Sequence, residues 1–368
     1  MQMGVAHMVY PGAVHTRFLH SLGACHLMGK ALDELSAKGI EVLPEERTAA
    51  RLAILLHDIG HGPFSHALEH SVLNGIGHET VSRIIIQKLS SRFPGMLDKA
   101  RQIFDLAYDK PFLYQLVSSQ LDVDRLDYLS RDSFYSGVSE GVIGYDRILK
   151  MLTVRDKELA VEEKGIYSVE KFIIARRLMY WQVYLHKTVL GAELLLVNIL
   201  KRAKELCAAG ETLAAGETLS YFLYRNITVQ ELESGEEAIN YFCQLDDTDV
   251  IIAIKAWTRS SDPILARLCR MYQHRRLYRV IFDPADEAQM LQDQQQRLKK
   301  SLGLKDSELH YFACSGETTN STYNAGDTRI RIAMKDGSVV DISDVDHALV
   351  TPSLLVPVTK RYLCYYKD

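Results

Sequence analysis

The segment HDIGHGPFSH, residues 57–66, carries the strongest structural signal in the sequence. A helical apolar pattern over 45–59 precedes it, and Gly60-His61-Gly62-Pro63 must form a turn, because glycine and proline end helices. Neighbouring side chains on a helix point about 100° apart. At the last turn of a helix, however, the backbone lets His57 and Asp58 converge on one ion. Imidazole and carboxylate together suit a divalent metal such as Mn, Fe or Mg.

Histidines are crowded into the same part of the chain, since nine of the thirteen lie between residues 7 and 78. Taken alone, a His-Asp pair is more often a capping or core feature than a metal site. Two further segments change that balance: RFLHSLG at 17–23 and DVDRLDY at 122–128. His20 in the first and Asp124 in the second can complete the ligand shell. Asp122 and Asp127 are equally well explained by helix capping and ion pairing.

These segments occur in the order found in the HD-domain phosphohydrolases, which the sequence resembles from Gln2 to about Tyr278. Within that family it resembles the deoxynucleoside triphosphate (dNTP) triphosphohydrolases, in the branch of the mammalian SAM- and HD-domain enzyme. The resemblance implies a mainly α fold with an HD-type helical bundle. It also implies one divalent ion (Mn, Mg, Fe, Ni or Zn) with four ligands, namely His20, His57, Asp58 and Asp124.

The resemblance assigns the catalytic groups as well. Hydrolysis of a phosphate ester needs a proton for the leaving oxygen, and imidazole titrates near neutral pH. His66 is the implied general acid, with His61 and His78 near the phosphates. Glu69 stands where relatives often carry an aspartate that orients the acid. His26 and His70 match no functional position, so we expect surface or packing roles for them.

A triphosphate needs cations around it. Arg17 and Arg125 lie next to the proposed ligands, and Arg125 replaces a lysine that is common in the family. We expect 168–207 to form one long helix on which four side chains share a face: Arg176, Tyr180, Tyr184 and Lys187. Such a face is usually solvated or packed. The resemblance nevertheless implies that Arg176 binds the terminal phosphate, with Tyr180 near the phosphates and Tyr184 against the sugar.

The resemblance places the remaining substrate contacts at the sugar and the base. Gln2 and Asp132 match partners of the 3′-hydroxyl, and Tyr128 matches a residue near the triphosphate. Met3 replaces a leucine that limits the space below the sugar. Leu185 replaces a polar residue that meets the base, which leaves the base preference open.

The function expected from these residues is hydrolysis of dNTPs to deoxynucleoside and inorganic triphosphate. One alternative is an HD phosphohydrolase that acts on another nucleotide phosphate ester. The other is a non-catalytic nucleotide-binding regulator. Relatives carry a further N-terminal segment before the residue that matches Gln2, and in some it helps to bind an activating nucleotide at a subunit interface. We therefore expect this chain to lack that segment, so activator regulation does not carry over from the relatives. A homo-oligomer is the expected assembly, and whether an activating nucleotide is a further partner is left open.

The composition argues against several other classes of protein. The net charge is −4 and the charged fraction 24%, so a general nucleic-acid binder, which is usually basic, is disfavoured. The longest strongly apolar run, 189–200, is too short and too charged to span a bilayer, and residues 1–4 resemble no signal peptide. The six cysteines show no CxxC spacing and are expected to be reduced thiols. We expect a cytoplasmic protein without a membrane partner.

The chain is expected to divide into a helical domain at 1–279 and a small α+β module at 280–368. Periodicity predicts helices at 20–33, 45–59, 78–91, 97–108, 112–119, 121–135, 235–244, 247–258, 262–273 and 287–302. A hairpin is expected at 152–161 and a strand at 278–282. Alternating stretches at 309–314, 328–334 and 338–342, with a turn at Lys335-Asp336-Gly337, indicate further strands.

Overall fold

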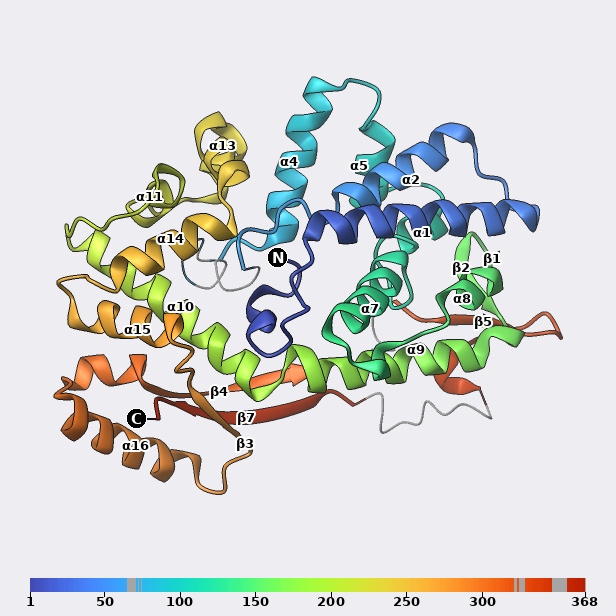
Figure 1. Ribbon diagram of the computed structural model, residues 1–368. Coiled ribbons are helices and arrows are strands. Elements are labelled where there is room, and N and C mark those ends of the chain that lie inside the picture. The colour runs from blue at the N-terminus through green and yellow to red at the C-terminus, as the bar shows by residue number, and fades with distance from the viewer. Residues whose placement is uncertain are drawn as a thin grey trace.

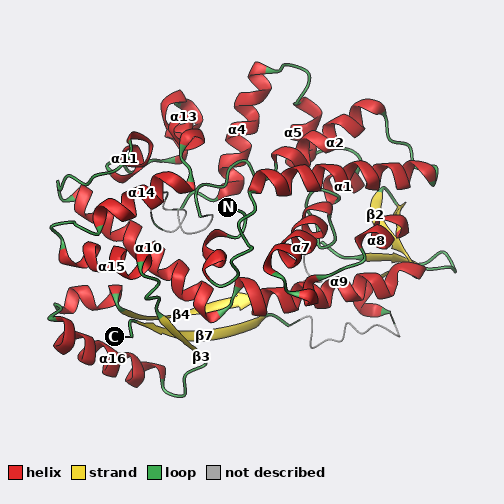
Figure 2. Ribbon diagram, in the orientation of Figure 1, coloured by secondary structure: helices red, strands yellow, loops and turns green. Residues whose placement is uncertain are grey.

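The computed structural model describes residues 1–64, 71, 73, 75–320, 323, 328–345 and 356–367, and most of them are helical (Figures 1 and 2). The helices of the first half are α1 (Arg17–Ala37), α2 (Pro44–Leu56), α4 (His78–Arg92), α5 (Asp98–Phe104), α6 (Pro111–Gln115), α7 (Val123–Ser136), α8 (Tyr145–Met151) and α9 (Ile166–Met179). Those of the second half are α10 (Lys187–Ala208), α11 (Glu217–Leu223), α12 (Val229–Ser234), α13 (Glu236–Gln244), α14 (Asp247–Trp257), α15 (Pro263–Gln273) and α16 (Glu287–Leu302).

Helices α1, α2, α7 and α9 surround one buried apolar cluster. Local sequence fixes where several of them begin. Thr16 caps α1 by accepting the Leu19 N–H, and Asp122 caps α7 by accepting the Arg125 N–H. Pro44 is the first residue of α2, where its missing N–H costs nothing. Gly137, in the left-handed conformation with φ of 72°, ends α7. Helices α1 and α7 therefore begin with the segments 17–23 and 122–128 that were singled out in the sequence.

The prediction of one long helix over 168–207 is wrong. A π-helical turn at Tyr180–Tyr184 follows α9, with the Leu185 N–H bonded to the Tyr180 carbonyl five residues earlier. His186 then adopts an extended conformation and caps α10. Helix α10 leaves at 57° to the preceding helix. The break contains neither glycine nor proline, which is why periodicity does not reveal it.

Two small sheets complete the fold. The first has strand order β1 (Leu152–Arg155), β2 (Glu158–Glu162), β5 (Arg331–Ala333), β6 (Val339–Asp341). The second has the order β3 (Arg279–Phe282), β7 (Val358–Tyr365), β4 (Ala313–Asn320). In the second sheet both neighbours of β7 are antiparallel to it. This sheet lies between α10 and α16 (Figure 1).

The mainly α class with a C-terminal α+β part is confirmed. The hairpin β1–β2 and the β5–β6 turn at Gly337, with φ of 90°, form as predicted. The C-terminal residues divide between both sheets, and the core around α10 and α15 continues into them through Leu298 and Leu363. The domain boundary at residue 279 therefore remains a proposal.

Some boundaries differ from the prediction. Helix α2 ends at Leu56, so His57 and Asp58 lie just beyond it. Helices α5 and α6 are shorter than expected, and Asp306–Tyr311 forms a 3₁₀ helix before β4 instead of part of a strand. Three short α-helices of the described part, α8, α11 and α12, had no predicted counterpart. No single helix among the described residues is long and apolar enough to cross a membrane, although one bent pair, Glu163–Tyr184 with Lys187–Ala208, reaches that length and composition together.

Candidate active site

His57 and Asp58 leave the end of α2 in a tightly held turn. The Nδ1 of His57 donates to the carbonyl of Ile54 at 2.6 Å, so it is Nε2 whose lone pair can bind a metal. Ser82 of α4 donates from its hydroxyl to the His57 carbonyl and accepts the Gly60 N–H, each at 2.9 Å. A Cβ on Gly60 would lie 2.2 Å from the His78 carbonyl oxygen. Its position in the sequence had indicated a left-handed helix end. The structure shows instead that Gly60 is required for close packing.

His20 is fully buried on the first turn of α1. Its Nδ1 lies 2.8 Å from a carboxylate oxygen of Asp127, which also accepts two hydrogen bonds from Arg131 at 2.8 Å. A histidine whose Nδ1 donates to a carboxylate presents Nε2 to a metal, and the carboxylate makes the ring a stronger ligand. Asp127 therefore orients His20, a role that the sequence left undecided between capping and ion pairing.

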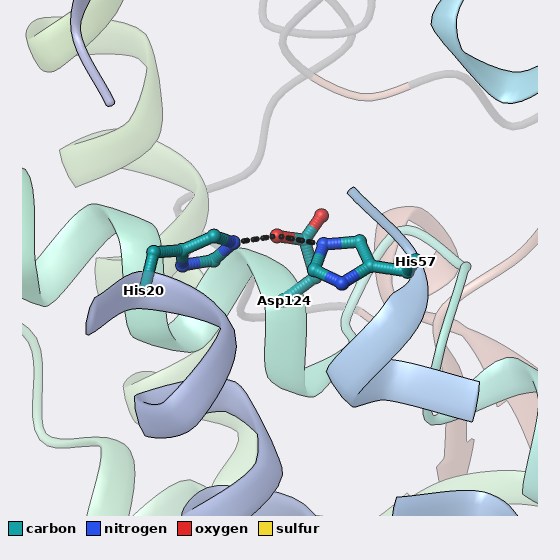
Figure 3. Close-up of side chains that lie close together, drawn as sticks. All are labelled: His20, His57 and Asp124. Atoms are coloured by element: carbon teal, nitrogen blue, oxygen red, sulfur yellow. Dashed lines mark ion pairs between the residues drawn. The ribbon is translucent and has the colours of Figure 1, made fainter. Parts of the chain in front are cut away.

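The proposed ligands converge. The Nε2 atoms of His20 and His57 lie 3.0 Å and 3.3 Å from the same oxygen of Asp124 (Figure 3). The ligand atoms of these three residues all lie within 4.8 Å of one another. Asp58 borders the group, with one oxygen 3.4 Å from His57 Nε2 and the other bonded to Arg17 at 2.6 Å.

This donor set fits a divalent ion. Within the described part of the chain, both buried Nε2 atoms face the same Asp124 oxygen without a well-formed hydrogen bond, an arrangement that a bound ion would satisfy. Two imidazoles and two carboxylates are a mixed nitrogen and oxygen set that suits Mn, Fe, Ni or Zn. The four side chains come from α1, from the segment after α2, and from α7, so an ion would link three separate parts of the chain.

The charges of these side chains shift one another's pKa values. Burial by itself would lower the pKa of His20, but Asp124 and Asp127 raise it to about 10. Burial would also lower the pKa of His57, but Asp58 and Asp124 raise it to about 8. Burial would raise the pKa of Asp124, yet His57 and His20 hold it well below its usual value. A metal ion therefore has to displace protons from the imidazoles as it binds.

His61 and His78 lie beside this group. Their rings stack with centroids 3.7 Å apart, and His61 Nε2 is 3.5 Å from Asp58. Burial, together with the charges of Arg17 and His78, lowers the pKa of His61 to about 4, so this imidazole is neutral at pH 7. His66 and Glu69 lie outside the described residues.

A cavity of about 730 Å³ adjoins the group, a volume ordinary for a small-molecule site. Six of the predicted substrate residues line it: Gln2, Arg17, Tyr128, Asp132, Tyr180 and Tyr184. Met3 and Leu185 line it too, as do Thr318 and Tyr362 from the second sheet. The C-terminal strands therefore form part of the cavity wall, which nothing in their sequence indicated.

The other three predicted cations are not among the described lining residues. Arg125 pairs with Asp122, and the charges of Arg125 and Arg176 both act on Tyr128. Arg176 also contacts Gln120 at 3.4 Å. The ammonium of Lys187 lies 5.7 Å from the ring centre of Phe282, because the break before α10 separates it from the face that carries Arg176. Its phosphate role stays a prediction.

One residue that the sequence reasoning missed is His15. Its buried ring donates to one oxygen of Asp132 at 2.8 Å and stacks on Tyr135 with centroids 4.4 Å apart. The hydroxyl of Tyr184 donates to the other oxygen at 2.8 Å. Asp132 is thus fixed from two sides. The crowding of histidines before residue 78 was the only signal that pointed toward His15.

Known proteins share the sequence motifs and the fold of this chain. The model of the HD domain matches residues 17–132, and that of the HD associated region matches residues 143–221. The crystal structure of a phosphohydrolase from Bacteroides thetaiotaomicron has a TM-score of 0.94 and 44% identity, and the match covers 100% of this chain and 91% of that one. This chain belongs to the HD-domain family. The resemblance seen in the sequence is therefore confirmed.

Curated relatives of this HD-domain protein are longer than it is. The uncharacterized protein YwfO of Bacillus subtilis is 34% identical over 78% of this chain and 65% of its own length. A Dictyostelium discoideum protein named deoxynucleoside triphosphate triphosphohydrolase SAMHD1 homolog is 31% identical over 65% of this chain and 51% of its own. The chain thus spans about half to two thirds of these relatives.

Proposed function

We propose that this HD-domain protein is a metal-dependent phosphohydrolase that cleaves dNTPs to deoxynucleoside and inorganic triphosphate. The observation that carries the proposal is Arg17. It bonds Asp58 of the ligand group and also lines the large cavity, so the group opens onto a space suited to a nucleotide. The name of the Dictyostelium relative supports dNTPs as the substrate class.

His20, His57, Asp58 and Asp124 would hold the ion. A bound divalent ion supplies positive charge and lowers the pKa of water, so that a nucleophile forms at neutral pH. Arg17, Arg125 and Arg176 neutralise charge on the phosphates. His66 donates a proton to the 5′-oxygen that leaves the α-phosphorus. His61 and His78 contact the phosphates, and Glu69 orients His66.

The sugar is recognised by the tyrosine and carboxylate pair in the cavity. Tyr184 is the last residue of a π-helical turn, a feature frequent at functional sites, and its hydroxyl is fixed by Asp132. A side chain held this firmly against the 2′ side of the sugar leaves no room for a hydroxyl. A rigid wall discriminates far better than a loose apolar pocket, which tolerates an added hydroxyl within about 10²-fold.

The test is product analysis with Mn or Mg against dATP, ATP and dAMP, resolved by chromatography. We expect dATP to yield deoxyadenosine and inorganic triphosphate, with ATP and dAMP turned over poorly. Equal cleavage of ATP would favour the broader phosphohydrolase. Binding of dATP and metal without turnover would favour the non-catalytic regulator.

We also propose that the chain self-associates and that an activating nucleotide acts through the assembly. Helices α1 and α7 expose large apolar side chains on the surface, among them Phe18 at 68% and Phe134 at 79% exposure. Self-association would remove such apolar side chains from water, which is favourable. Sedimentation velocity with and without added dNTP would show a dimer or larger species, and a monomer under both conditions would contradict the proposal.

A further inference from the structure

Phe64 lies in the wall of the cavity in an unusual backbone conformation. Its φ is 52°, in the left-handed region that residues other than glycine rarely adopt. Its side chain is buried and lines the same space as Gln2 and Arg17. Such a conformation persists only where surrounding groups hold it in place.

The holding group is Asp247, from a distant part of the chain. Its Oδ1 accepts the backbone N–H of Phe64 at 2.9 Å, across 183 positions in sequence. A hydrogen bond to a carboxylate is about twice as strong as a neutral one. This side chain thus anchors a segment that lines the cavity.

Helix α14 does not need this carboxylate for its own cap. Asp247 is its first residue, and the capping residue is Asp246, which accepts the N–H groups of Thr248 and Asp249. A carboxylate in the first turn interacts favourably with the helix dipole. That effect is the purely structural explanation, and it does not require the side chain to bond Phe64.

We propose that Asp247 is a positioning residue for the active site. The segment that follows the proposed ligand Asp58 is held at Gly60 by Ser82 and at Phe64 by Asp247. The chain reaches His66 two residues after Phe64. The catalytic part of this inference rests on the proposed function, whereas the anchoring of Phe64 does not.

The experiment compares Asp247→Ala, Asp247→Asn and Asp246→Ala. Asparagine keeps an oxygen that can accept the Phe64 N–H, and Asp246→Ala removes the cap of α14 without touching Phe64. Three quantities are measured for each variant: kcat on dATP, bound metal, and hydrogen exchange in the peptide that contains the Phe64 amide. Asp247→Ala should exchange faster there and lose about 10- to 100-fold in kcat, the worth of a hydrogen bond to a charged group, with metal content unchanged.

Asp247→Asn should stay closer to the wild type, and Asp246→Ala should lower the Tm but keep kcat. Equal loss of kcat in Asp246→Ala and Asp247→Ala would reduce Asp247 to a structural residue and overturn the proposal. An unchanged exchange rate at Phe64 in Asp247→Ala would overturn it as well. That readout needs no turnover, so it remains decisive if the wild type fails to cleave dNTPs.

Discussion

At the scale of single residues, the metal group depends on contacts behind the ligands. His20 can present Nε2 only because Asp127 binds its Nδ1, and His57 only because the Ile54 carbonyl binds its own. The sequence singled out the four proposed ligands because they lie in recognisable motifs. It could not assign the partners His15, Ser82 and Asp127, since their roles depend on which helices meet in space.

Asp127→Asn should weaken metal binding by about 10- to 100-fold, the usual effect of altering the partner of a ligating histidine. Asparagine removes the charge that raises the basicity of His20 and that pairs with Arg131. Titration calorimetry with Mn would measure the change. Asp146→Ala is the matched control, because Asp146 pairs with Lys30 on the outside of α1. An unchanged Mn affinity in Asp127→Asn would remove Asp127 from the metal centre.

At the scale of elements, the turn after α2 packs directly on α4. A Cβ at Gly60 would lie 2.2 Å from the His78 carbonyl oxygen and 2.3 Å from the Ser82 nitrogen, and both are backbone atoms that cannot rotate away. The α2–α4 distance is therefore set by the absence of a side chain at residue 60.

Gly60→Ala should lower the free energy of unfolding by about 1–3 kcal/mol, the typical cost of overpacking. It should also weaken Mn binding, because the turn carries His57 and Asp58. Thermal unfolding and calorimetry measure the two effects. Gly29→Ala, inside α1 with its nearest neighbour atom 3.9 Å away, should keep the Mn affinity and raise the free energy of unfolding by about 0.5–1 kcal/mol, because alanine favours a helix more than glycine does. A stable Gly60→Ala variant with normal Mn affinity would show that α4 is free to shift.

Sequence patterns predicted most elements because long helices repeat every 3.6 residues and hairpins carry turn residues. They failed where hydrogen bonding between distant residues decides the outcome. The π-helical turn before Leu185 has no glycine or proline to mark it. Strand β7 pairs with β3 and β4, which lie far from it in sequence.

At the scale of the whole molecule, the proposed metal ligands come from α1, the segment after α2 and α7, while the cavity extends to the second sheet. The C-terminal residues, which the sequence suggested as a separate module, contribute Thr318 and Tyr362 to the cavity wall. Binding of an ion to the folded state alone stabilises that state, by about 2.7 kcal/mol at 100 times the Kd. Stability and activity should therefore depend on the same ion.

The most direct test removes that ion. Purified protein is dialysed against a chelator, and Mn is then added back in steps while the Tm and the release of triphosphate from dATP are followed together. We predict that both fall on chelation and return together at one Mn per chain, and that Asp124→Ala shows neither recovery. Full turnover by the metal-free protein, or recovery of activity in Asp124→Ala, would contradict the account.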